Sequence, residues 1–242
     1  MIELLFFIAL SLGFGVLASL LARRLDSFES LVMGIPVGLA IFMAVTCLFG
    51  QAIEPISYLL LFAAMAGVVI WNGMPGRLKI EIDSGWIIVM LIFIIYTYVF
   101  MTGAFSYPLL EDDDSWQHAA GIRYISEFHS FIQPEPRLIH YLAPYPPFYD
   151  ALLSVLFQAG DSTLQDVMKT YNALLCGLVI PLFYVWSRNR FGKDIGLWST
   201  FLVAVMPAFM TPPRAMSGSS QCWRIGRSNM PTYWRARYIV PV

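Results

Sequence analysis

The chain has 242 residues, of which 58% are hydrophobic and only 13% are charged, with a formal net charge of −1. A mean hydropathy of +0.65 excludes an ordinary soluble domain. The near-neutral charge gives no indication of nucleic-acid binding, so nucleic acid is not an expected partner. The sequence predicts an all-α, polytopic integral membrane protein with about six transmembrane helices and interfacial helices in a long external loop.

Six apolar stretches approach or reach the length of about 20 residues that crosses a bilayer. They cover residues 3–22, 31–50, 54–72, 86–106, 168–187 and 194–211. The first is long enough to span, carries Glu3 and has no basic region before it, so we expect a membrane helix and not a cleavable signal peptide. Pro36 and Pro181 are expected to kink their helices, and Gly13 and Gly15 indicate close helix packing.

The basic residues predict which side of the membrane each connection faces. Three connections share seven of them, namely Arg23, Arg24, Arg77, Lys79, Arg188, Arg190 and Lys193. The long segment 107–167 contains only Arg123 and Arg137. By the positive-inside rule the three basic connections face the cytoplasm, and segment 107–167 lies outside it. We expect a multi-pass protein of a membrane such as the plasma membrane of a prokaryote, with its active face outside the cytoplasm.

The predicted organisation has three parts. Residues 1–72 form an N-terminal three-helix membrane segment, residues 86–218 form a second module with the external acidic loop 107–167, and residues 219–242 form an irregular tail. The arginines of this tail would lie outside, against the positive-inside rule that the other connections obey. We therefore expect a truncated or out-of-frame end, with a short interfacial tail as the alternative.

Two helices are expected in the external loop. The first starts at Asp114, capped by Asp114 or Ser115, presents a broad apolar face through Phe131, and ends before Pro134. The second covers the apolar run 148–157. Because this run is too short to span a bilayer, the sequence favours an interfacial or half-inserted helix.

An acidic cluster follows the fourth apolar stretch. Asp112, Asp113, Asp114 and His118 place three carboxylates and an imidazole within seven residues. On a helix that begins at Asp114, His118 lies one turn later on the same face. These groups suit Mg²⁺ or Mn²⁺, with positions left for a phosphate, and a carboxylate there can serve as a general base. A solvated acidic loop that caps a helix is the alternative.

The order of these features resembles the GT-C superfamily of membrane glycosyltransferases. Span 86–106, the Asp112-x-Asp114 motif, the helix 115–131, Tyr145-Pro146-Pro147-Phe148-Tyr149 and the returning span 168–187 follow one another as in that family. Asp114-Ser115-Trp116-Gln117-His118 also looks like the D-P-W-Y-H motif of oligosaccharyltransferase catalytic subunits. The resemblance covers about residues 86–218. The family's W-W-D-Y-G motif is absent, so protein N-glycosylation is not expected.

The resemblance implies a hexosyltransferase. It would move a sugar from a polyprenyl-phosphate donor to a glycan, lipid or protein acceptor, in contact with membrane lipids. Asp114 and then Asp112 are implied as catalytic residues and, with His118, as ligands of Mg²⁺ or Mn²⁺. The candidate substrate-binding residues are Asp113, Arg123, Arg214 and Tyr145.

Two other hypotheses remain open. One is a transporter or channel whose acidic loop attracts cations, which is weakened because no predicted span carries Asp, Glu, Lys or Arg deep inside it. The other is an inactive fragment of a longer enzyme.

Overall fold

The computed structural model describes residues 2–21, 28–72, 82–110, 113–134, 139, 142 and 146–206. Regular structure in these ranges is helical, apart from one isolated β-bridge between Gln51 and Ser130. Met1–Pro212 belongs to one compact unit. The predicted tail 219–242 lies outside the described residues.

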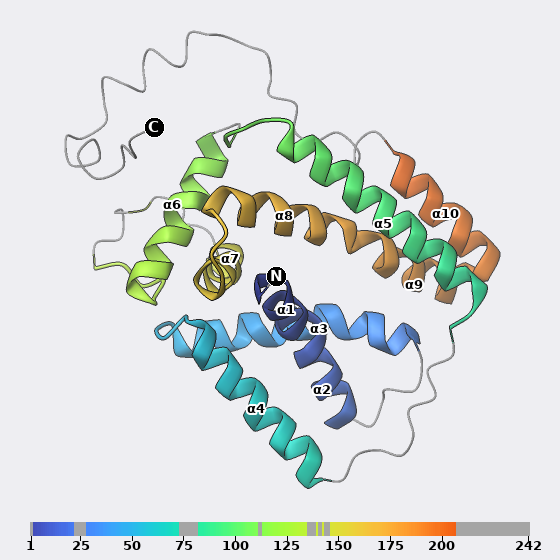
Figure 1. Cartoon of the computed structure of the whole chain (residues 1–242). Coiled ribbons are helices and arrows are strands. Elements are labelled where there is room, and N and C mark those ends of the chain that lie inside the picture. Colours follow the sequence, from blue (N-terminus) through green and yellow to red (C-terminus); the bar gives the residue numbers. More distant parts are fainter. Residues whose placement is uncertain are drawn as a thin grey trace. The chain divides into compact units, whose positions relative to one another are not determined.

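Figure 1 shows the helices of the described residues. In chain order they are α1 (Ile2–Ile8), the π-helix η1 (Ala9–Gly13), α2 (Phe14–Leu21), α3 (Phe28–Phe49), α4 (Pro55–Trp71), α5 (Ser84–Phe105), α6 (Asp113–Phe128), α7 (Phe148–Ala159), α8 (Leu164–Gly177), α9 (Val179–Phe191) and α10 (Lys193–Val205).

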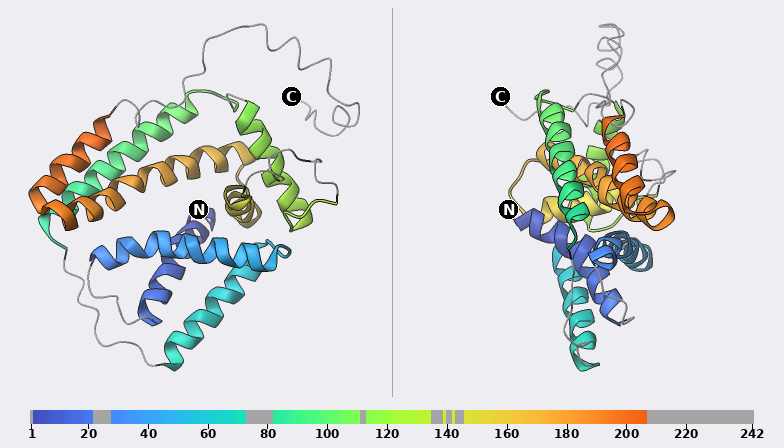
Figure 2. Two further views of the ribbon diagram at one scale, coloured as in Figure 1. Left: turned by 180° about the vertical axis from the view of Figure 1, so that it is seen from behind. Right: turned by 90° about the vertical axis from the view of Figure 1, so that its right-hand side faces the viewer.

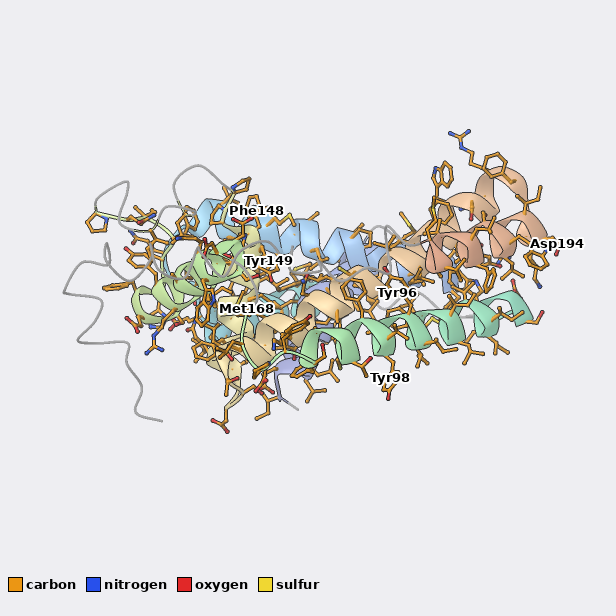
Figure 3. All side chains as sticks on the ribbon, turned by 90° about the horizontal axis from the view of Figure 1, so that it is seen from above. Tyr96, Tyr98, Phe148, Tyr149, Met168 and Asp194 are labelled. Carbon is orange, nitrogen blue, oxygen red and sulfur yellow. The ribbon has the colours of Figure 1, made fainter. Side chains whose placement is uncertain are left out.

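Four helical segments are long and apolar enough to cross a membrane, so the prediction of a helical membrane protein is confirmed at this level. They are Ile2–Leu21, Phe28–Leu48, Ser84–Phe105 and Leu164–Phe191. Tyr98 of α5 shows the outward, lipid-compatible face of such a helix, because its side chain is 66% exposed and points away from the neighbouring helices, whereas Tyr96 is buried (Figure 3). Helices α4 and α10 have 17 and 13 described residues, so the six predicted spans stay a prediction.

The two prolines inside predicted spans have different consequences. Between α8 and α9 the helix is interrupted at Leu178, three residues before Pro181. Pro181 has no N–H to offer the Gly177 carbonyl, and its ring crowds that carbonyl, which accounts for the interruption. Pro36 lies inside α3, which continues across it.

Glycines allow the first helical segment to lie against α3. A Cβ atom at Gly15 would overlap the backbone of Gly34, and one at Gly38 would overlap the carbonyl oxygen of Ser11. The close packing predicted for Gly15 is therefore confirmed. The prediction for Gly13 is confirmed too, with α4 as the neighbour, because a Cβ atom there would lie 2.8 Å from the ring of Phe62. Backbones that approach this closely gain dispersion contacts, which is the main attraction between helices in lipid.

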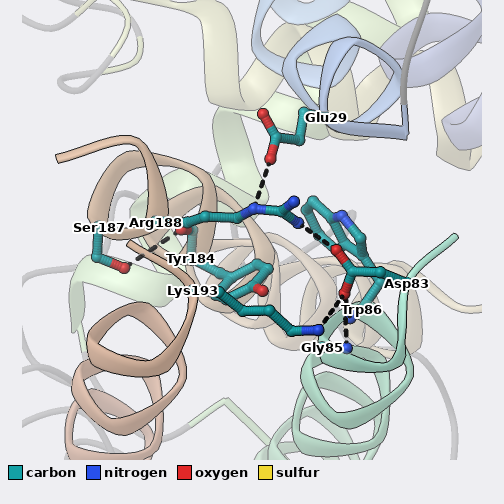
Figure 4. A network of polar contacts seen from close by, with 8 residues as sticks. All are labelled: Glu29, Asp83, Gly85, Trp86, Tyr184, Ser187, Arg188 and Lys193. Atoms are coloured by element: carbon teal, nitrogen blue, oxygen red, sulfur yellow. Dashed lines mark hydrogen bonds and ion pairs between the residues drawn. The ribbon is translucent and has the colours of Figure 1, made fainter. Parts of the chain in front are cut away.

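A polar network joins α3, α5, α9 and α10 at one end of these helices (Figure 4). Arg188 Nε lies 2.9 Å from Glu29 Oε1, and Arg188 Nη1 lies 2.7 Å from Asp83 Oδ2. The ammonium of Lys193 is 3.3 Å from Asp83 Oδ1. Asp83 also caps α5, because its carboxylate accepts the Gly85 N–H at 2.7 Å. The network brings together the ends of three connections that the positive-inside rule places on one side of the membrane.

Three of the helices that bear this network, α5, α9 and α10, also lie against one another (Figure 2). Gly192, with a φ of 88°, turns the chain between α9 and α10, which then lie side by side. Below the ion pairs, the rings of Trp86 and Tyr184 meet edge to face with centroids 4.9 Å apart. Arg188 therefore lies next to these buried aromatic rings as well as within the ion-pair network.

The close packing at Gly38 predicts that a Gly→Ala substitution has a different effect there than at Gly67. Gly38→Ala should destabilise the protein by about 1–3 kcal/mol, because the added methyl group forces α3 away from Ser11. Gly67→Ala in α4, where nothing lies within 4 Å of the new Cβ, should be neutral or stabilise by about 0.5–1 kcal/mol. Thermal unfolding of the purified protein in detergent checks both, and equal effects would contradict close packing at Gly38.

The ion-pair network predicts a pH-dependent contribution to stability. Burial by itself raises the pKa of Asp83, but the Gly85 amide, Lys193 and Arg188 outweigh it, so the net pKa is lowered. Such a carboxylate stabilises the fold above its unfolded pKa of about 4 and loses this contribution as the pH falls through the lowered value.

Arg188→Met should therefore cost about 1–2 kcal/mol at neutral pH, between the values for exposed and buried pairs, and clearly less at pH 3. The matched control is Arg190→Met, which removes an exposed arginine of the same helix and should change stability by no more than about 0.5 kcal/mol. Thermal unfolding at the two pH values decides, and a pH-independent loss would contradict the role of Asp83.

Candidate functional site

The acidic cluster lies at the beginning of α6. This helix begins at Asp113, so Asp114 and Ser115 lie inside its first turn, and the prediction that either caps it is wrong. Asp113 and Asp114 are both exposed. Negative charge in the first turn of α6 interacts favourably with the positive end of the helix dipole. Glu111 and Asp112 lie outside the described residues.

The other end of α6 also differs from the prediction. The helix ends at Phe128 and not at Phe131, because His129 adopts a left-handed conformation with a φ of 53°. Ser130 then pairs with Gln51. The helix therefore stops where its backbone begins to bond to another part of the chain, before Pro134 is reached.

A histidine–aspartate pair joins α6 to α7. His118 Nδ1 lies 2.8 Å from Asp150 Oδ1, across 32 residues of sequence. The Asp150 side chain is 4% exposed and that of His118 is 34% exposed. The sequence predicted His118 as a site residue but did not single out Asp150. The sequence does contain a signal for Asp150. It is an acidic residue within the apolar run 148–157, and such residues need a specific partner.

Two neighbours fix this pair in place. Gly121 of α6 leaves room for the carboxylate, since a Cβ atom there would collide with Asp150 Oδ2. Tyr149, next to Asp150 at the start of α7 (Figure 3), presents its ring to the imidazole with centroids 5.2 Å apart and planes 74° apart. Two consecutive residues of α7 therefore hold the His118 ring.

The buried position of the pair determines its electrostatics. Burial raises the pKa of Asp150, and the hydrogen bond and charge of His118 oppose the shift without cancelling it. Burial also raises the pKa of Tyr149, and the neighbouring Asp150 adds to this effect. A carboxylate bound to Nδ1 fixes the orientation of the imidazole ring. This is the arrangement of a general base oriented by a carboxylate.

Helix α7 is buried by protein. Every residue from Asp150 to Leu156 is buried, and the helix packs against α1, α4, α6 and α8 (Figure 1). The sequence favoured an interfacial or half-inserted helix for this run. Its apolar character instead reflects a place in the largest hydrophobic core, although its length is indeed below that of a membrane span.

Of the other predicted site residues, the structure describes Asp113, Asp114 and Arg123. Arg123 pairs with Glu127 one turn later on α6, with Nε 3.0 Å from Oε1, and both side chains are about half exposed. Asp112, Tyr145 and Arg214 lie outside the described residues. Lys169, which the sequence did not single out, donates to the carbonyl of Tyr107 at 2.5 Å.

The described part of the chain does not by itself contain a metal site. Within it, no three histidine, cysteine, aspartate or glutamate side chains come together closely enough to hold an ion. Asp114 and His118 offer ligand types that suit Mg²⁺ or Mn²⁺, and the predicted third ligand is Asp112.

No family model, curated protein or solved structure matches this chain. The likeness to GT-C enzymes therefore depends only on the order of motifs in the sequence.

The burial of Asp150 predicts an unusual effect of its neutral analogue. A carboxyl whose folded pKa is raised contributes stability below its unfolded pKa and loses it as the pH rises. Asp150→Asn should therefore be at least as stable as the original protein at pH 7, with a smaller difference at pH 4. Thermal unfolding at both pH values measures this. A variant that is much less stable at pH 7 than at pH 4, relative to the original, would contradict it.

Proposed function

We propose that this protein is a membrane glycosyltransferase that uses a polyprenyl-phosphate sugar, with His118 as the general base and Asp150 as its orienting carboxylate. One observation carries the proposal: a buried aspartate holds the imidazole that the sequence motif had already singled out. Purely structural histidines do not need a desolvated carboxylate behind them, and burying one is costly. A perturbed acid beside a partly exposed histidine is typical of functional sites.

The proposed chemistry is a direct displacement. Nε2 of His118 takes the proton of an acceptor hydroxyl as its oxygen attacks the anomeric carbon of the sugar. The bond between that carbon and the phosphate oxygen breaks, and its electron pair leaves with the polyprenyl phosphate. Asp150 stabilises the imidazolium that forms. One displacement of this kind inverts the anomeric centre.

Asp114 is the second candidate for the base. It lies one turn before His118 on α6, which places both side chains on the same face of the helix. Asp114 and Asp112 also remain the proposed ligands of Mg²⁺ or Mn²⁺, with His118. Because the described residues do not complete such a site, no step of the mechanism is assigned to a metal.

The setting proposed for the reaction follows from the sequence. The donor's lipid would lie in the bilayer, and the acceptor, a glycan, lipid or protein, would approach from outside the cytoplasm. Asp113, Arg123, Tyr145 and Arg214 remain candidates for binding the substrates. A prokaryotic plasma membrane would supply both the donor and this orientation.

Transfer of radiolabel from polyprenyl-phosphate hexoses, in membranes that contain the protein, tests the proposal. His118→Ala and Asp150→Asn should each lower the transfer rate about 100-fold or more, in the range that general-base catalysis contributes. Asp114→Asn distinguishes the two candidate bases. The control is His129→Asn, which removes an exposed histidine just beyond the end of α6, and asparagine tolerates the left-handed backbone there. A transfer rate in His118→Ala equal to that of the original protein would exclude His118 as the base.

The transporter hypothesis gains one observation from the structure. Glu3 and Asp150 are both buried acidic residues, and such residues also form proton relays in transporters. Absence of transfer from every donor, together with ion flux in liposomes that Asp150→Asn abolishes, would favour transport over glycosyl transfer.

A further inference from the structure

The connection between α3 and α4 bonds to both helices that hold the histidine–aspartate pair. In this α3–α4 link, residues 50–54, Ile53 N–H donates to the carbonyl of His129 at 2.8 Å. The carbonyl of Ile53 accepts from Gln158 Nε2 at 3.0 Å. His129 follows the last residue of α6, and Gln158 lies in the last turn of α7. One buried residue therefore ties the ends of the two helices together.

The backbone of the link is shaped for these contacts. Gly50 and Ala52 have positive φ values of 43° and 66°. An alanine in this region costs on the order of 1 kcal/mol and persists only where surrounding contacts enforce it. Those contacts are present, because Ser130 Oγ donates to the Gly50 carbonyl at 2.7 Å and Ile53 is 1% exposed.

The N-terminal helix holds the end of α7 at a second point. Glu3 of α1 is buried, and its Oε1 accepts the hydroxyl of Ser162 at 2.6 Å and the Ser162 N–H at 3.3 Å. Gly160 makes the approach possible, because a Cβ atom there would overlap the Glu3 carboxylate. The first helical segment and the α3–α4 link thus fix the same end of α7 from two directions.

We infer that the N-terminal segment, residues 2–72, positions Asp150 against His118 by fixing the ends of α6 and α7. A helix transmits a displacement of one end to the other, and a hydrogen bond of 2.8 Å is lost after a shift of about 1 Å. Glu3 and Gln158 are positioning residues, since neither touches His118. The N-terminal segment thereby has a role at the proposed site, and only the catalytic consequence of this positioning rests on the proposed function.

The test observes the pair directly. The full chain, labelled with ¹⁵N-histidine and held in detergent micelles or nanodiscs, should show a hydrogen-bonded Nδ1–H proton from His118. Its identity is established by its loss in Asp150→Ala. Gln158→Ala and Glu3→Ala should each raise the exchange of this proton with water about tenfold, because the pair opens more often.

Matched variants separate positioning from general damage. Glu3→Gln keeps an oxygen that accepts from Ser162 and should restore slow exchange. Gln165→Ala removes a glutamine of α8 that lies outside these contacts and should have no effect. Ser162→Ala deletes only one donor, so it provides the same readout should Glu3→Ala fail to fold. In the transfer assay, the positioning variants should lower kcat and leave KM unchanged.

Unchanged exchange in folded Gln158→Ala and Glu3→Ala, or in Ser162→Ala if Glu3→Ala does not fold, would overturn the inference. Faster exchange without any transfer activity in the original protein would support the positioning role and reject the glycosyltransferase. Transfer that depends on His118, with exchange indifferent to Gln158 and Glu3, would reject the positioning role and keep the enzyme.

Discussion

The burial of Asp150 is the constraint on which the arrangement of α6 and α7 depends. A carboxylate that is almost completely removed from solvent must have a partner, because an unpaired buried charge costs several kcal/mol. His118 is that partner, and Gly121 is the residue that lets α7 come close enough. Once these two helices are joined, α7 becomes a central element of the core, and α1, α4 and α8 pack around it.

The same principle operates where other charged groups are withdrawn from solvent. Glu3 is held by Ser162, and Arg188 is held by Glu29 and Asp83. Each pairing joins residues far apart in the sequence, and the pairings of Glu3 with Ser162 and of Glu29 with Arg188 connect the N-terminal segment to the later helices. In an apolar environment the helices attract one another mainly through close contact and hydrogen bonds. A few such polar pairings therefore specify which helices meet and in what register.

The site changes the mechanism that the motif alone would suggest. A run of aspartates draws attention to carboxylates as base or metal ligands, and both roles remain proposals for Asp114 and Asp112. The structure adds an imidazole, that of His118, whose orientation is fixed by Asp150 and by the adjacent ring of Tyr149. The proposed reaction then places the acceptor near a partly exposed histidine and the acidic turn that precedes it.

The sequence by itself determined the helical membrane class, the long apolar helices, the close packing at Gly15 and the place of His118 one turn after Asp114. These features are local, since they depend on apolar length, small side chains and helical spacing. The tertiary structure decided the partner of His118, the early end of α6 and the protein-buried position of α7. Hydropathy cannot distinguish burial in protein from burial in lipid, and a bond between residues 118 and 150 leaves no periodic pattern. Only the packing of α7 against α6 brings that carboxylate to the imidazole.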